Sequence, residues 1–92
     1  MIVTFKHKGL LVYYRDGDAS GLPSVYLRKV NRILDQLDAV TCNDDVAQLG
    51  SGIHRLTGKL SEFWSIKVSP NYRITFRFEK GDIFDVDYLD YH

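Results

Sequence analysis

The sequence predicts an α+β fold in which a short N-terminal strand and two helices precede three to four mainly antiparallel strands. Apolar residues recur at helical spacing in the first half of the chain, most clearly at Val30, Ile33, Leu34 and Leu37. From Ile53 onward, apolar and polar residues alternate with a period of two, which is typical of strands with one buried face. We therefore expect the helices to pack on one face of the sheet and the other face to be polar.

The first strand is expected over residues 2–5, a short apolar run. A short helix follows it, with an apolar stripe at Leu10, Leu11, Tyr13 and Tyr14. Asp16, Gly17 and Asp18 supply the stop signal, because glycine accepts the backbone conformation in which helices commonly end.

The second helix is expected to start near Pro23, whose missing N–H costs nothing in the first turn of a helix. Its opposite face is polar and is most simply a solvated surface. Residues 46–49 follow, and we expect either a single helical turn or an ordered loop there.

The strands are expected over residues 64–68, 72–78 and 83–91, separated by turns that contain proline or glycine. Alternation assigns one face of the sheet to the core residues Trp64, Ile66, Val68, Tyr72, Ile74, Phe76, Phe78, Phe84, Val86 and Tyr88. The other face is then expected to present Lys67, Arg73 and Arg77 opposite Asp85 and Asp87. This charged face is the place to look for a site.

The length, charge and composition of the chain limit the classes of function that it can have. The 92 residues are the usual size of one domain, which we place over 1–92. Twelve basic and twelve acidic residues give a formal net charge of zero, so no overall field attracts nucleic acid or membrane. A lone Cys42 predicts neither an internal disulfide nor a zinc site, and we expect no metal or other cofactor. With no long apolar run, the chain is expected to be cytoplasmic and to have no membrane partner.

Several residues could cleave RNA without a metal. That reaction needs a group to take the proton of the 2′-hydroxyl, a second to protonate the leaving oxygen, and cations beside the phosphate. The chain ends in Asp90, Tyr91 and His92, an acid, a phenol and an imidazole within three residues, and His54 is a second imidazole. By themselves these residues are weak signals, since a terminal Tyr-His is more often a disordered tail.

Two arginines could hold the scissile phosphate by bidentate hydrogen bonds. Arg73 and Arg77 lie on the same strand at even spacing and so share a face. The alternative is cross-strand pairing with Asp85 and Asp87. Spacing alone favours that pairing for Arg77 and leaves the two interpretations of Arg73 equal.

Histidine and tyrosine residues elsewhere have simpler explanations. His7, between Lys6 and Lys8, is expected to be a solvated loop residue rather than an RNA contact. Most of the six tyrosines are expected in the core or at its rim, although tyrosine rings can stack on bases. Only Tyr91 lies beside other candidate catalytic groups.

Four segments resemble those of HigB-type toxins of the RelE-like family, in the family's order and over nearly the whole chain. They are residues 5–10 (Phe-Lys-His-Lys-Gly-Leu), 63–68 (Phe-Trp-Ser-Ile-Lys-Val), 71–78 (Asn-Tyr-Arg-Ile-Thr-Phe-Arg-Phe) and 87–92 (Asp-Tyr-Leu-Asp-Tyr-His). Such an ordered set is more specific than any single short motif.

The resemblance implies a RelE-like fold and a toxin that cuts messenger RNA in the decoding site of the ribosome. It also implies a helix-turn-helix antitoxin of the HigA type, through which the pair would contact operator DNA. Carried onto the matching positions, it makes His54, Asp90, Tyr91 and His92 the catalytic group. Arg73 becomes the phosphate-binding residue.

One position departs from the family's pattern. After the histidine the family commonly has Pro-Leu-Lys-Gly-Asp, whereas His54 is followed here by Arg-Leu-Thr-Gly-Lys. Thr57 cannot supply the positive charge of the family's lysine. Either Arg55 or Lys59 replaces it, or activity is weaker, or that lysine is not essential.

Two other functions remain open at this point. The chain could be a relative that has lost catalysis and only binds an antitoxin, which the threonine at position 57 would favour. It could also act on free RNA or a nucleotide, because no residue by itself specifies the ribosome. Zero net charge argues mildly against that option, since a free nuclease usually has its own cationic surface.

Overall fold

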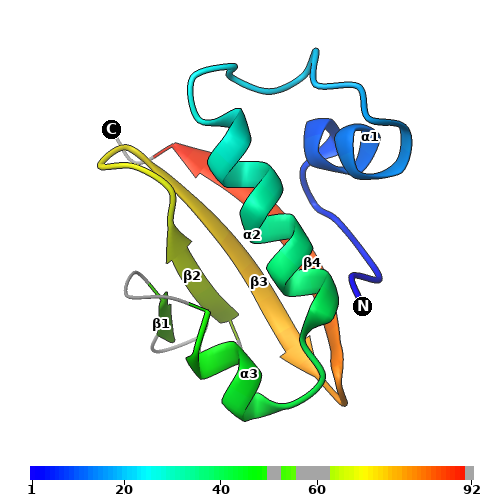
Figure 1. Ribbon diagram of the computed structural model, residues 1–92, viewed down its shortest axis with the longest axis vertical. Coiled ribbons are helices and arrows are strands. Elements are labelled where there is room, and N and C mark those ends of the chain that lie inside the picture. The colour runs from blue at the N-terminus through cyan, green and yellow to red at the C-terminus, as the bar shows by residue number, and fades with distance from the viewer. Residues whose placement is uncertain (50–52, 56–62, 91–92) are drawn as a thin grey trace.

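The computed structural model describes residues 1–49, 53–55 and 63–90 (Figure 1). The helices are α1 (Lys8–Asp16), α2 (Leu27–Ala39) and α3 (Asn43–Ala47), and the strands are β1 (Ile53–Arg55), β2 (Phe63–Lys67), β3 (Tyr72–Glu79) and β4 (Asp82–Asp90). The described strands form one antiparallel sheet in the order β1-β2-β3-β4. The predicted α+β fold is confirmed. A single helical turn was one of two alternatives for residues 46–49, but α3 begins three residues earlier and covers only the first two of these residues.

The N-terminal segment pairs with the edge of the sheet without forming a continuous strand. Ile2 and Phe5 make isolated parallel bridges to Ile83 and Val86 of β4. Two residues separate the bridged positions on each chain segment, so the regular alternation of a strand is interrupted on both sides. The predicted strand over residues 2–5 is therefore present as edge pairing only.

Helix α1 is capped at both ends by local chemistry. Nδ1 of His7 accepts a hydrogen bond from the backbone N–H of Leu10 (3.2 Å), which satisfies one of the donors that the first helical turn leaves unpaired. Gly17 adopts a left-handed conformation (φ 75°) and donates its N–H to the carbonyl of Tyr13. The expectation that His7 is a solvated loop residue is wrong: its ring is half-buried and caps the helix.

Helix α2 begins four residues after Pro23, not near it. Residues 24–26 form a turn closed by the N–H of Leu27 and the carbonyl of Ser24, and the first helical bond runs from Val30 to Tyr26. The predicted apolar stripe is confirmed, because Val30, Ile33, Leu34 and Leu37 are all buried. At 13 residues α2 is the longest helix among the described residues. None of the helices in the described residues is long and apolar enough to cross a membrane.

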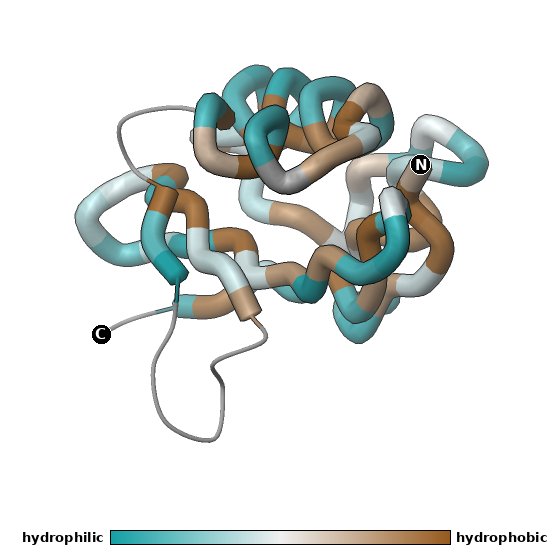
Figure 2. Tube along the Cα trace, turned by 90° about the horizontal axis from the view of Figure 1, so that it is seen from below, coloured by the Kyte–Doolittle hydropathy of each residue, from teal (hydrophilic) through white to brown (hydrophobic). Residues whose placement is uncertain are grey.

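The core lies between α2 and one face of the sheet. Figure 1 shows α2 crossing in front of β3 and β4, and Figure 2 shows this helix layered over the strands with its apolar side toward them. Ile74 and Phe76 of β3 are fully buried beneath it, as is Leu37 of α2. Burial of each such side chain contributes roughly 1.5–3 kcal/mol. The opposite sheet face, which we call the open face, is not covered by α2.

A bulge in β4 changes which residues face the core. Thr75 is opposite Asp87, but Arg77 is opposite Phe84, so β4 has one extra residue between these pairs. Asp85 takes a positive φ of 56° there. The prediction that Phe84 belongs to the core face is wrong, because the bulge places Ile83 in the core and Phe84 beside Arg77.

Candidate active site on the open sheet face

Strand register arranges the side chains of the open face in three rows, because residues opposite each other in a sheet point to the same side. The first row runs across all the described strands and consists of His54, Ser65, Thr75 and Asp87. The second consists of Lys67, Arg73 and Leu89. The third consists of Phe63, Arg77 and Phe84.

Two cations stand directly opposite each other in the second row. Lys67 of β2 pairs in register with Arg73 of β3, and Lys67 is exposed. Like charges at such positions repel each other, and an anion placed between them is attracted to both. The sequence pattern put both residues on this face, but only the register makes Lys67 the direct partner of Arg73.

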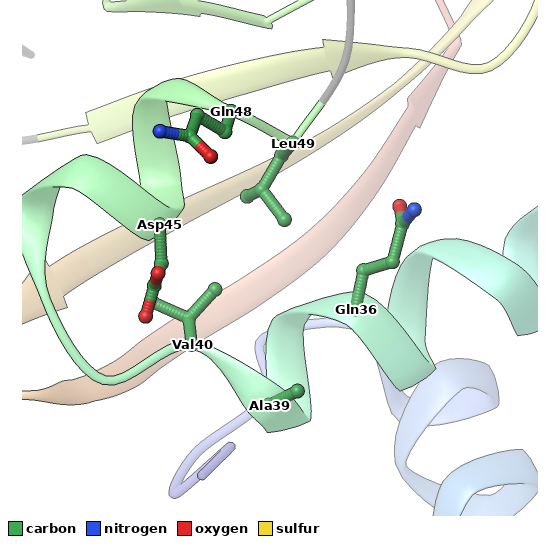
Figure 3. Close-up of a pocket in the computed structure, with 6 residues that line it drawn as sticks. All are labelled: Gln36, Ala39, Val40, Asp45, Gln48 and Leu49. Atoms are coloured by element: carbon green, nitrogen blue, oxygen red, sulfur yellow. The ribbon is translucent and has the colours of Figure 1, made fainter.

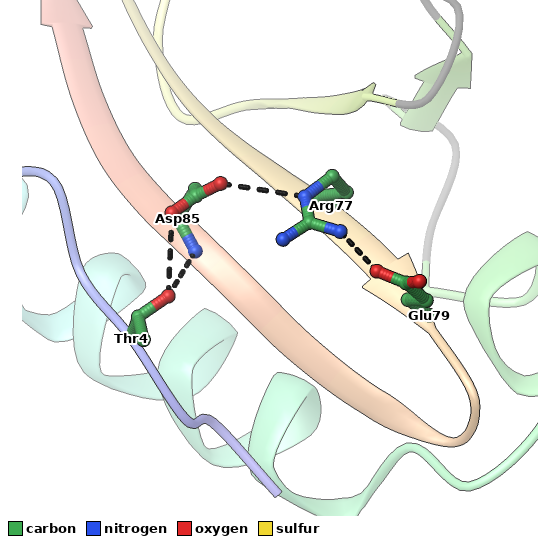
Figure 4. A network of polar contacts seen from close by, with 4 residues as sticks. All are labelled: Thr4, Arg77, Glu79 and Asp85. Carbon is green, nitrogen blue, oxygen red and sulfur yellow. Dashed lines mark hydrogen bonds and ion pairs between the residues drawn. The ribbon is translucent and has the colours of Figure 1, made fainter.

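Arg77 is paired within the protein. Its guanidinium forms ion pairs with Glu79 and, at 3.3 Å, with Asp85 (Figure 4). It also lies 4.9 Å from the centroid of the Phe84 ring. Asp85 is held in turn by Thr4, whose hydroxyl accepts a hydrogen bond from the Asp85 N–H. The hydrogen bond to Glu79 is the main reason that the pKa of Arg77 is raised. Cross-strand pairing with Asp85, the interpretation that spacing favoured, is confirmed.

Two side chains from distant parts of the chain meet on the open face. Lys6 follows the N-terminal edge pairing beside β4, yet its Nζ atom lies 5.6 Å from the centroid of the Phe63 ring on β2. Neighbouring strands are about 4.8 Å apart, so the two side chains start about three strand spacings apart and meet above the open face. Thr75 of β3, which lies between these strands on the same face, is buried.

The predicted site residues divide between the two faces. His54 and Arg73 lie on the open face in adjacent rows. Arg55 pairs in register with Trp64, on the α2 face, and its guanidinium lies 5.6 Å from that ring. Asp90, opposite Tyr72 at the end of β4, is also on the α2 side by register and is exposed. Thr57, Lys59, Tyr91 and His92 lie outside the described residues.

Tyrosine rings surround the end of the sheet where Asp90 lies. The rings of Tyr26, Tyr72 and Tyr88 follow one another with centroids 6.0 Å and 5.2 Å apart. Burial raises the pKa of Tyr88 to about 12, and the neighbouring phenols add to the effect. These tyrosines are core or rim residues, as expected for most of the six.

A separate hollow of about 280 Å³ lies between α2 and α3 (Figure 3). It is lined by Gln36, Ala39, Val40, Asp45, Gln48 and Leu49, none of which is a predicted site residue. Among the residues that the structure describes, no three His, Cys, Asp or Glu side chains gather as a metal site would require. The rows of the open face therefore hold the arrangement with the clearest chemistry, which is suited to a phosphate beside an imidazole.

Comparison with known proteins assigns the fold to a class. The YoeB–YefM complex from Staphylococcus aureus shares the fold with a TM-score of 0.63 at 16% identity, covering 100% of this chain and 98% of that one. The YoeB dimer from the same organism gives 0.62 at 17% identity, with coverages of 100% and 97%. The model of the RelE-like toxins of type II toxin–antitoxin system HigB matches residues 3–92. This chain is thus a RelE-like toxin of a type II system.

A curated relative shows which family of this class the chain belongs to. Endoribonuclease HigB from Proteus vulgaris is 41% identical over 95 residues, which cover 100% of both chains. The chain belongs to the HigB-like toxin family. The resemblance drawn from the four sequence segments is confirmed, and membership of a toxin–antitoxin family supports an antitoxin partner.

Proposed function

We propose that this chain is an endoribonuclease that cuts messenger RNA on the ribosome and so stops translation. The relative from Proteus vulgaris is named as an endoribonuclease, and the chain matches it from end to end. The observation that carries the proposal is the Lys67–Arg73 pair in the row next to His54 on the open face. Two facing cations beside an imidazole are suited to an RNA phosphate and a proton transfer.

In the proposed reaction, the 2′-hydroxyl of a nucleotide attacks the adjacent phosphorus. One imidazole, of His54 or His92, takes the hydroxyl proton as the P–O bond forms. The other protonates the 5′-oxygen as its bond to phosphorus breaks, which leaves a 2′,3′-cyclic phosphate and a 5′-hydroxyl. Arg73 stabilises the extra negative charge of the phosphorane, and no metal is required.

Asp90 and Tyr91 have supporting roles in this proposal. Asp90, at the end of β4, holds the tautomer of the His92 imidazole, and Tyr91 positions or stacks a base. Because Asp90 is on the α2 side by register, it acts through the residues that follow it and not by contact with Arg73. Arg55 and Lys59 remain candidates to replace the lysine that Thr57 lacks.

The ribosome is the proposed site of cleavage because of charge. Twelve acidic residues balance twelve basic ones, so the protein has no general attraction for free RNA. A factor that enters the decoding site finds the codon already held there. Cytoplasmic action follows from this proposal, since translating ribosomes are there.

The partner is proposed to be a helix-turn-helix antitoxin of the HigA type, through which the pair binds operator DNA. Membership of a type II toxin–antitoxin family is the main support for a partner. The YoeB of Staphylococcus aureus, which shares the fold, forms a complex with YefM, and this adds to that support. Binding is tested by copurification with the product of the adjacent gene.

Expression without the antitoxin, with mapping of 5′ ends on cellular messages, tests the activity. We expect growth arrest and new cuts inside translated codons, and no cutting of naked RNA. Arg73→Ala and His92→Gln should abolish both effects, whereas the exposed Arg32→Ala of α2 should not. Unchanged toxicity in the first two variants would overturn the site assignment.

The second candidate function is a binding module without catalysis. The threonine at position 57 favours it, because it removes a cation that the family commonly has. A folded wild-type protein that binds the antitoxin but causes neither arrest nor cuts would establish this function in place of the first.

A further inference from the structure

Ser65 has a buried hydroxyl without a partner. The residue is 2% exposed, and its Oγ atom makes no hydrogen bond. Buried polar groups are almost always hydrogen-bonded, and an unsatisfied one costs about 1–3 kcal/mol. In the described chain, the only other buried side-chain oxygen or nitrogen of this kind is the hydroxyl of Tyr88, on the opposite sheet face.

Ser65 also lies at the centre of the candidate site. It is directly opposite His54 on one side and Thr75 on the other. Arg73 is two residues before Thr75 and therefore a diagonal neighbour of Ser65, at about 7–8 Å between backbones. An arginine side chain spans such a distance, so one phosphate oxygen can lie within reach of both residues.

We infer that Ser65 is a substrate-binding residue, whose hydroxyl donates a hydrogen bond to the phosphate of the RNA backbone that Arg73 holds. The inference deepens the proposed function and rests on it. A phosphate oxygen accepts the hydroxyl proton that has no acceptor in the free protein, so the bond forms only when substrate is present. The unsatisfied hydroxyl thus lowers the stability of the free protein and favours the complex.

The surroundings of Ser65 allow this contact. Its neighbours on the same strand and face are Phe63 and Lys67, two residues away on either side. The Phe63 ring is covered by the Lys6 ammonium, which is exposed and borne on a flexible side chain. An incoming phosphate attracts Lys6 and Lys67 alike, because both side chains are exposed cations.

The test compares Ser65→Ala with Ser69→Ala. Ser69 is also buried, but its Oγ accepts hydrogen bonds from the N–H groups of Asn71 and Tyr72. Both variants, wild type and Arg73→Ala are assayed for cleavage of a message on translating ribosomes, for binding of a 2′-deoxy, uncleavable form of that message, and for thermal unfolding.

Ser65→Ala should cut about ten- to a hundredfold more slowly, bind the uncleavable message more weakly, and melt at the wild-type temperature or above it. Ser69→Ala should melt lower and cut at the wild-type rate per folded molecule. Wild-type cleavage and binding by Ser65→Ala would overturn the inference, as would a lower melting temperature with unchanged binding. If wild type itself neither cuts nor binds while folded, the proposed function fails, and the Ser65 contact fails with it.

Discussion

Asp38 on α2 joins the N-terminal segment and α1 to α2 by hydrogen bonds. Its Oδ1 accepts hydrogen bonds from the backbone N–H of Ile2 (3.1 Å) and from the hydroxyl of Tyr14 (2.8 Å) on α1. The bond from Ile2 is the main reason that the pKa of Asp38 is lowered, and the bond from Tyr14 adds to it. The perturbation we consider is Asp38→Asn, which keeps an acceptor but removes the charge.

The expected magnitude follows from these two bonds. Hydrogen bonds to a buried charged group contribute about 1.5–3 kcal/mol each, and solvent exposure of Asp38 reduces this to about 0.5–1 kcal/mol. Asp38→Ala, which removes both bonds, should therefore cost about 1–2 kcal/mol, or roughly 4–16 °C in melting temperature. Asp38→Asn should cost less than half as much, and Tyr14→Phe about half.

The pH dependence of stability shows how much of the effect of Asp38→Asn comes from the lost charge of the carboxylate. A carboxyl with a lowered folded-state pKa contributes stability above its unfolded pKa of about 3.9, and this is lost as pH falls through the folded pKa. Urea unfolding of wild type and Asp38→Asn is measured from pH 7 to pH 3. The difference between their free energies of unfolding should become smaller as the pH falls. A difference of constant size, or equal stability at pH 7, would refute the reasoning.

Three further predictions concern stability and are checked by thermal unfolding. Gly9→Ala should destabilise despite the helix propensity of alanine, because its Cβ would lie 2.6 Å from the carbonyl oxygen of Gly21; the loss should be about 1–3 kcal/mol, and a gain would contradict the contact. Tyr88→Phe should leave stability equal or raise it by up to about 1 kcal/mol, because the hydroxyl is buried without a partner; a loss above that would show that it has one. Asp85→Ala should lower the free energy of unfolding by about 1–2 kcal/mol, because Asp85 has a left-handed backbone conformation that alanine adopts less readily. Asp85→Asn should lower it clearly less, because asparagine tolerates that conformation; equal losses would mean that the backbone conformation is not the cause.

Periodicity in the sequence predicted the helices and strands well because the burial of apolar side chains determines the pattern of both. The stripe of α2 and the alternation of β2 and β3 are each set by burial against a single core. The start of α2 was harder, because Pro23 is compatible both with a first helical turn and with the turn that precedes Leu27. His7 was missed since a histidine cap has no distinctive spacing, although its place just before an apolar stripe was a signal.

The candidate site shows the limit of a pattern along one strand. Alternation put Lys67, Arg73 and Arg77 on one face, and the structure keeps them there. It could not predict that Arg77 pairs with Asp85 and Glu79 or that Arg73 lies opposite Lys67, because both depend on register between strands. Ser65 gave no signal at all, since its interest lies in a missing hydrogen bond that only packing reveals.

The bulge at Asp85 connects the hairpin turn to the candidate site. Lys80 and Gly81 both have positive φ, as a two-residue hairpin turn requires, and this turn pairs Glu79 with Asp82 and directs Ile83 into the core. Strict alternation from there would bring Asp87 and Leu89 to the α2 face and Tyr88 to the open face.

One extra residue at Asp85 reverses that outcome. Tyr88 stays in the core, Leu89 comes opposite Arg73, and Asp90 leaves the sheet on the side of α2. The backbone of Asp85 is held by the Thr4 hydroxyl and its carboxylate by Arg77, so these contacts support the bulge that determines the faces of Leu89 and Asp90. Arg77 thereby affects the position of Asp90, one of the proposed catalytic residues, through the shape of β4 and without having to touch RNA.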